Sequence, residues 1–170
     1  LEDSKKEMIL LQLMDIVAHA HKHRIVHRDI KPENIVVRQD SVVKLLDYGV
    51  AKELKQKDIS STMVGSRPFM APEQISGESQ IASDVWALGI VMYATYTGYL
   101  PFYHDNEKIL MDLILTIEPR PPREVEPDIP VELEGIILKC LKKDPKDRFA
   151  DAGILKTTIL TTFPQFGKDA

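Results

Sequence analysis

Four polar side chains in the first third of the chain have the types and spacing needed for chemistry on an anionic group. Asp29, Lys31 and Asn34 lie in the segment 27–34, and Asp47 follows a short apolar stretch. A carboxylate such as Asp29 can accept a proton from a hydroxyl group and orient its oxygen for attack. Lys31 can neutralise negative charge, and Asn34 and Asp47 carry oxygen atoms of the kind that Mg²⁺ prefers. The set is therefore suited to proton transfer and to holding an anionic group together with Mg²⁺.

Three short motifs occur in a fixed order: His-Arg-Asp-Ile-Lys-Pro-Glu-Asn at 27–34, Asp-Tyr-Gly at 47–49 and Ala-Pro-Glu at 71–73. They resemble the C-terminal, catalytic lobe of a eukaryotic-type Ser/Thr protein kinase, and the resemblance covers nearly the whole chain. It implies transfer of the γ-phosphoryl group from ATP to serine or threonine hydroxyls of protein substrates. The implied site residues are Asp29, Lys31 and Asn34 for catalysis, Asn34 and Asp47 for Mg²⁺, and Val36 with Asn34 and Asp47 for ATP.

By the same resemblance, residues 47–73 form the activation segment. Thr62 stands where many kinases carry an activating phosphate, and Arg28 and Lys52 would receive that phosphate. An ordinary polar loop threonine is the alternative reading. Two other hydroxyls compete for the role: Ser60 and Ser61. Two residues are assigned to the substrate pocket: Ser66 and Glu33.

The resemblance also implies residues that hold geometry rather than react: His27, Tyr48, Glu73, Asp84 and Arg148. Glu73 and Arg148 should form a buried ion pair that ties the end of the activation segment to the lobe. Asp84 should cap the backbone of the catalytic loop. Tyr48 stands where the family usually has Phe, and its ring should pack beside His27.

The elements that must position these residues are mostly helices. Apolar residues recur with helical spacing over 4–22, which predicts a long first helix. Residues 35–37 and 42–46 have the pattern of two short strands on either side of the turn 38–41, which predicts a hairpin. Apolar residues point in every direction from Asp84 to Thr97, which predicts a buried central helix.

Further helices are predicted after this central one. One begins at Asp105 or Asn106, another runs from Pro130 to Asp144, and the last covers about 152–161, with 119–130 as a Pro-rich connector. Together they make a helical subdomain over 84–163. The fold class is therefore mainly α with a small β-hairpin, in one domain over residues 1–170, as in a kinase C-lobe.

Half of a kinase active site is missing from these residues. No glycine precedes Gly49, so there is no Gly-rich phosphate loop, and no Val-Ala-Ile-Lys strand precedes the catalytic motif. We therefore expect a fragment that is inactive without an N-terminal lobe. An apolar face should be exposed where that lobe or a partner chain docks.

Composition excludes other classes. The net charge of −4 argues against a general nucleic-acid binder. The single cysteine, Cys140, lies in an apolar run and is expected to be a buried thiol in a reducing compartment. No run approaches about 18 apolar residues, so no membrane segment is predicted. A cytoplasmic location is expected.

Two other functions fit parts of the pattern. A pseudokinase or lone-lobe scaffold would explain the missing half, although it has no chemical need for the complete catalytic set. A small-molecule phosphotransferase could share the catalytic loop, but Ala71–Glu73 with Arg148 builds a platform for a protein substrate. Within the kinases, residues 97–103 resemble calmodulin-dependent-type enzymes, whereas Gln74 and residues 127–130 resemble bacterial eukaryotic-like ones.

Overall fold

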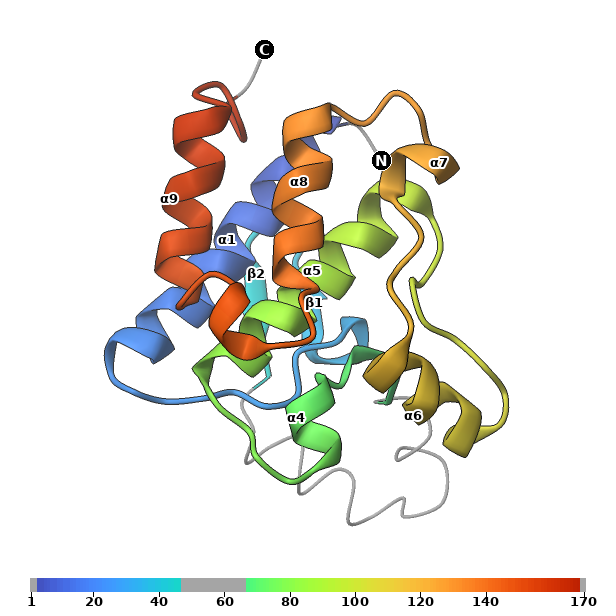
Figure 1. The fold of residues 1–170 in the computed structure, drawn as a ribbon. Helices are drawn as coiled ribbons and strands as arrows, with labels where there is room; N and C mark the ends of the chain where they lie inside the picture. Colours follow the sequence, from blue (N-terminus) through green and yellow to red (C-terminus); the bar gives the residue numbers. More distant parts are fainter. Residues whose placement is uncertain (1–2, 47–66, 169–170) are drawn as a thin grey trace.

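Helices dominate the computed structural model, which describes residues 3–46 and 67–168. The first helix, α1 (Asp3–Lys22), lies alongside the last, α9 (Ala152–Thr162), and α8 (Val131–Cys140) stands next to them (Figure 1). The central helix α5 (Ile81–Thr97) packs against all three. The predicted mainly α fold with a small β-hairpin is confirmed.

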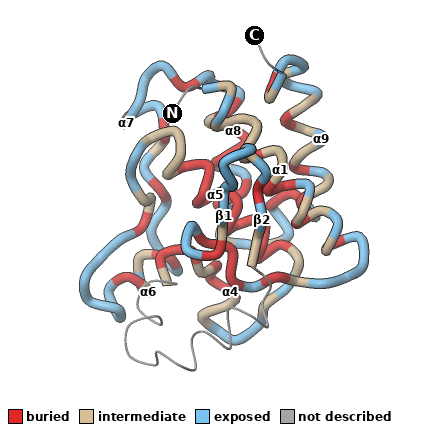
Figure 2. The backbone as a smooth tube through the Cα atoms, turned by 180° about the vertical axis from the view of Figure 1, so that it is seen from behind, coloured by how far each residue is buried: buried red, intermediate tan, exposed pale blue. Residues whose placement is uncertain are grey.

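Helix α5 forms the centre of the core. Its residues from Ala82 to Tyr93 are all buried, and Figure 2 shows buried residues concentrated along it and on the inner side of α1. Helix α8 approaches so closely that a Cβ on Gly89 would lie 2.5 Å from the Cβ of Cys140. Burial raises the pKa of the Cys140 thiol, which therefore stays protonated, as expected of a structural cysteine.

Helix α5 begins at Ile81, earlier than the predicted Asp84. The backbone amide of Gln80 donates to the Ser83 hydroxyl at 3.0 Å and closes the first turn. Asp84 consequently lies inside this turn rather than at the helix start. The helix ends at Thr97, and the residue that follows it, Gly98, has a φ of 79°, which glycine adopts without strain.

The hairpin consists of β1 (Ile35–Val37) and β2 (Val43–Leu45), paired antiparallel. The second strand is shorter than the predicted 42–46. Gln12 on α1 holds it in place, because its side chain accepts from the Val43 amide at 3.0 Å and donates to the Ser41 carbonyl at 2.8 Å. The hairpin is thus anchored to the first helix.

The remaining elements follow the predictions with small differences. Helix α6 (Glu107–Thr116) begins after Asn106, whose side chain accepts from the Ile109 amide. The connector 119–130 contains a short helix, α7 (Pro122–Val125), that the sequence reading did not anticipate. Its proline stands in the first turn, where a missing amide costs no hydrogen bond. The other short elements are α4 (Pro72–Ile75) and 3-10 helices at Pro32–Asn34, Arg67–Phe69 and Pro145–Asp147.

Candidate active site

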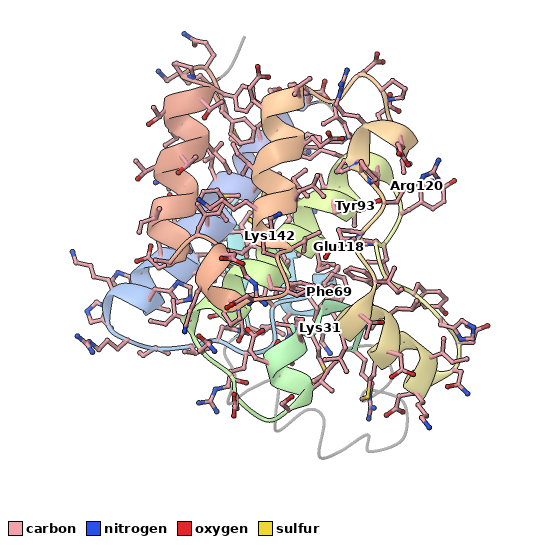
Figure 3. All side chains as sticks on the ribbon, in the orientation of Figure 1. Lys31, Phe69, Tyr93, Glu118, Arg120 and Lys142 are labelled. Atoms are coloured by element: carbon pink, nitrogen blue, oxygen red, sulfur yellow. The ribbon has the colours of Figure 1, made fainter. Side chains whose placement is uncertain are left out.

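Asp29, Lys31 and Asn34 converge in the loop between α1 and β1. The Asn34 amide nitrogen donates to the Asp29 carbonyl at 2.6 Å and to its carboxylate at 3.1 Å. Lys31 Nζ lies 3.8 Å from the other carboxylate oxygen, Oδ1 of Asp29. All three residues are buried, and Lys31 points into the body of the domain (Figure 3). The structure therefore brings together a carboxylate, a cation and an amide.

The donor set of Asn34 is compatible with a bound divalent cation. Because its amide nitrogen faces Asp29, its carbonyl oxygen is the atom left for a metal. Amide and carboxylate oxygens are the ligands that Mg²⁺ uses in proteins. Asp47, the second expected ligand, lies outside the described residues, as do Tyr48, Lys52, Thr62 and Ser66.

Asp84 holds the start of this loop from α5. One carboxylate oxygen accepts from the His27 amide at 2.8 Å, and the other accepts from the Arg28 amide at 2.9 Å. Oδ2 of Asp84 also lies 2.8 Å from Nε2 of the His21 side chain. His21 Nδ1 accepts from the Ala152 amide, so its Nε2 carries the proton and donates to Asp84. The predicted capping of the loop backbone by Asp84 is present in the structure.

His27 links the loop to the end of β2. Its Nδ1 accepts from the Asp29 amide at 3.1 Å, which leaves Nε2 to donate to the Leu46 carbonyl at 2.5 Å. The Leu46 amide in turn donates to the Asn34 carbonyl at 2.8 Å. Both ends of the catalytic loop are therefore bonded to the residue that directly precedes Asp47.

Arg28 adopts a strained backbone conformation beside the catalytic carboxylate. Its φ is 76°, a left-handed value that is uncommon for residues other than glycine. Asp84 accepts from its amide, and the Gln74 side chain donates to its carbonyl at 3.1 Å. The same Gln74 side chain accepts from the Ala71 amide at 2.9 Å. Gln74 thus connects the end of the activation segment to the catalytic loop.

The ion pair expected between Glu73 and Arg148 is present and buried. The Ser83 hydroxyl also donates to Glu73, at 2.6 Å. Burial alone raises the pKa of Glu73, but hydrogen bonds from Arg148 and Ser83 and the charge of Arg148 outweigh it and bring this pKa below its usual value. Glu73 is therefore a stable anion in the folded domain.

Three expected site residues lie at the surface: Arg28, Glu33 and Val36. Val36 is 44% exposed on β1, which is compatible with a surface that a ligand covers. Arg28 and Glu33 flank the buried Asp29 on the chain and are open to solvent.

The sequence reading missed several residues that hold the site: Gln12, His21, Gln74 and Ser83. Gln74 follows the Ala-Pro-Glu motif directly, so its position was a usable signal. His21 carried none, because a histidine at the end of an amphipathic helix is usually a surface residue. Its partners Asp84 and Ala152 are distant in the sequence.

Comparison with known proteins agrees with this geometry. Residues 1–160 match the family model for the protein kinase domain. A probable serine/threonine-protein kinase of Clostridium acetobutylicum is 37% identical over 144 residues, which are 83% of this chain and 22% of that protein. The serine/threonine-protein kinase PrkC of Bacillus subtilis is 36% identical over 160 residues, 91% of this chain and 24% of PrkC.

A third relative carries a different name. The tyrosine-protein kinase MasK of Myxococcus xanthus is 40% identical over 131 residues, 75% of this chain and 20% of MasK. The chain spans about a quarter or less of the length of each of these three relatives. With the family model matched over nearly its whole length and the catalytic loop assembled as described, this chain belongs to the protein kinase family.

Proposed function

We propose that this chain takes part in Mg²⁺-dependent transfer of the γ-phosphoryl group of ATP to serine and threonine hydroxyls of proteins. The observation that carries the proposal is the arrangement of Lys31 and Asn34 around the Asp29 carboxylate, held by Asp84. A scaffold protein would not need this set. Serine/threonine kinases among the relatives support the same acceptor class.

In this proposal Asp29 accepts the proton of the substrate hydroxyl and keeps its oxygen directed at the γ-phosphorus. A new bond forms between that oxygen and phosphorus, the bond to the bridging oxygen breaks, and ADP leaves. Lys31, beside Asp29, offsets the negative charge of the transferred group. Asn34 holds the Asp29 carboxylate in position through its amide nitrogen.

The same proposal assigns the cofactors. Asn34 and Asp47 would hold Mg²⁺ through their oxygens, and the exposed Val36 would lie under the adenine of ATP. When bound, the metal neutralises charge on the phosphates. Ser66 and Glu33 would contact the protein substrate, and the ring of Tyr48 would pack beside His27.

We also propose that a second lobe or a partner chain covers the apolar surface next to the hairpin. A cavity of about 480 Å³ lies there, and its lining is largely apolar: Ile16, Val17, Ala20, Ile25, Val26 and Leu45 with three histidines. Ile25, one of the residues that line it, is 58% exposed. Such a covering unit would supply the Gly-rich loop and the phosphate-binding lysine, and residues 1–170 alone would be inactive.

The cellular setting is proposed from two features. The one cysteine is a buried free thiol, and ATP-dependent transfer needs the cytoplasmic nucleotide pool, so we place the domain in the cytoplasm. Within the described residues, no helix is long and apolar enough to cross a lipid bilayer.

A phosphotransfer assay tests the proposed function. The protein that contains this chain is incubated with Mg²⁺, γ-labelled ATP and a peptide array, followed by phosphoamino-acid analysis. Phosphoserine and phosphothreonine are expected, and both should disappear in the Asp29→Asn variant. Phosphotyrosine alone would contradict the assigned substrate class, and no transfer by an intact, folded enzyme would favour the scaffold. The same assay on residues 1–170 alone tests whether a second lobe is needed, and no phosphotransfer is expected from them.

A further inference from the structure

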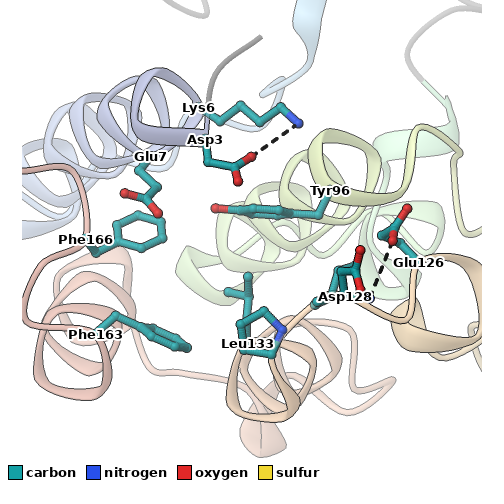
Figure 4. A pocket seen from close by; sticks show the side chains of 11 residues that line it. Asp3, Lys6, Glu7, Tyr96, Glu126, Asp128, Leu133, Phe163 and Phe166 are labelled. Carbon is teal, nitrogen blue, oxygen red and sulfur yellow. Dashed lines mark hydrogen bonds and ion pairs between the residues drawn. The ribbon is translucent and has the colours of Figure 1, made fainter. Parts of the chain in front are cut away.

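A second cavity, of about 470 Å³, lies at the end of the domain away from α4. The start of α1, the end of α5, the start of α8 and the segment that follows α9 enclose it (Figure 4). About half of its lining is apolar or aromatic, and charged side chains supply the rest. The apolar and aromatic part consists of Tyr96, Ile129, Pro130, Leu133, Phe163 and Phe166. Pockets of this size commonly hold a small ligand or a few inserted side chains.

The rim of this cavity is acidic on two sides. Asp3 and Glu7 project from α1 on one side, and Glu126 and Asp128 lie on the other (Figure 4). Lys6 is the one basic residue among the lining residues, and its Nζ is 4.0 Å from Asp3. In the described part of the chain, no cation pairs with the exposed carboxylate of Asp128. The rim therefore favours a ligand with positive charge at both ends.

The hydroxyl of Tyr96 requires a hydrogen-bond acceptor from any ligand in this cavity. Its oxygen is buried and has no hydrogen-bond partner among the described residues. Burial raises the pKa of Tyr96, and the nearby carboxylates of Glu7 and Asp3 raise it further, so the hydroxyl keeps its proton. An unpaired buried donor is costly, and a carbonyl oxygen on a ligand would satisfy it.

We propose that this cavity binds a basic, amphipathic peptide segment of a partner protein. One apolar side chain of the peptide would rest on Leu133 and Phe163, and flanking Lys or Arg side chains would reach Asp3 and Asp128. A peptide carbonyl would accept from Tyr96. A small amine carries one charge and could neutralise one side of the rim, whereas a peptide can place cations on both sides. The site lies apart from Asp29 and does not depend on the proposed catalytic function.

Fluorescence anisotropy with two labelled peptides tests the charge and shape requirements. The probe is Arg-Lys-Leu-Phe-Lys-Arg, and the comparison peptide, Arg-Lys-Ser-Ser-Lys-Arg, keeps the charges without the apolar side chains. We expect the protein to bind the probe at least about tenfold more tightly than the comparison peptide, because only the probe has apolar side chains that can contact the apolar part of the cavity. Equal affinity for both peptides would show attraction to overall negative charge and would overturn the proposal.

Matched variants locate the site. Asp128→Lys is expected to weaken probe binding about fivefold or more, whereas Glu132→Lys, an equal charge change on an exposed residue outside the cavity, should leave it nearly unchanged. Tyr96→Phe should weaken binding about fivefold without lowering the melting temperature, because the free protein loses only an unpaired hydroxyl. If neither Asp128→Lys nor Tyr96→Phe changes the affinity for the probe, the proposal is overturned. Binding of dodecylammonium without binding of the probe overturns it in favour of a small amphiphile.

Discussion

Glu73 and Arg148 meet in two parallel hydrogen bonds of 2.8 and 2.7 Å, although 75 positions separate them in the sequence. Arg148 also donates to the carbonyls of Ala82, Lys142 and Lys143. Its guanidinium lies 5.0 Å from the centre of the Trp86 ring. All five N–H donors of this cation are therefore used, and the pair fixes the Ala-Pro-Glu segment against α5.

Replacing Arg148 by Met should destabilise the domain strongly. The change leaves Glu73 buried without its charge partner, and breaking a buried pair from one side costs about 3–5 kcal/mol of unfolding free energy. Urea unfolding of the two proteins measures the difference. Arg120→Met is the control, because Arg120 pairs with Glu124 at the surface and its loss should cost about 1 kcal/mol or less. Similar losses in both variants would contradict this reading.

Acid stability should depend on Glu73. Its pKa in the folded domain is below the usual 4.5 of the unfolded chain, so its contribution is complete above about pH 4.5 and is lost as the pH falls through the folded pKa. In Glu73→Gln, the unfolding free energy should fall less steeply over this acid range. Unfolding curves between pH 6 and pH 3 check this. Glu124→Gln, at an exposed position, should keep the original slope.

Turnover should depend on the Asp29 carboxylate. Asp29→Asn keeps the shape of the side chain and removes the proton acceptor, so kcat should fall by about 10²- to 10⁴-fold while the KM for ATP changes little. Steady-state kinetics on the protein that contains this chain gives both numbers. Asp40→Asn, in the exposed turn of the hairpin, is the matched control and should retain kcat. Near-normal turnover in Asp29→Asn would remove this residue from the role of base.

Gln74 should act as a positioning residue. Gln74→Leu removes the bonds to the Arg28 carbonyl and the Ala71 amide, so the strained Arg28 loses a support next to Asp29. We expect kcat to fall about tenfold and the unfolding free energy to fall by only about 2 kcal/mol, since two hydrogen bonds are lost and each contributes roughly 1 kcal/mol net. Gln74→Glu keeps the acceptor for Ala71 but loses the donor to Arg28. If the bond to the catalytic loop is the important one, the kcat of Gln74→Glu should be as low as that of Gln74→Leu. If it is not, the kcat of Gln74→Glu should equal that of the wild type.

Phosphorylation of Thr62 should activate the enzyme. A phosphate adds about −1.5 to −2 charges, which Arg28 and Lys52 would pair with. Thr62→Ala should lower kcat by about tenfold, and Ser60→Ala, two positions earlier, should not. Mass spectrometry of active protein identifies the modified residue. Fully active enzyme with unmodified Thr62 would contradict the assignment.

Some of this architecture follows from the sequence because its causes are local. The absence of a polar face from Asp84 to Thr97 was enough to predict a buried helix, and α5 is the most buried element among those described. Asp29, Lys31 and Asn34 converge because they belong to one short loop, so their spacing determines which side chains can meet. The resemblance to kinases supplied the distant partner of Glu73.

The tertiary structure decided what periodicity cannot specify. His21, Gln74 and Gln12 acquire their roles from partners on other elements, and no local pattern states which buried donor will face which acceptor. The cavity beside Tyr96 exists only because the starts of α1 and α8, the end of α5 and the segment after α9 come together. The sequence by itself determined the catalytic residue types and the helices that carry them. Packing determined their partners, since hydrogen bonds and charge pairs depend on distances that only the folded chain sets.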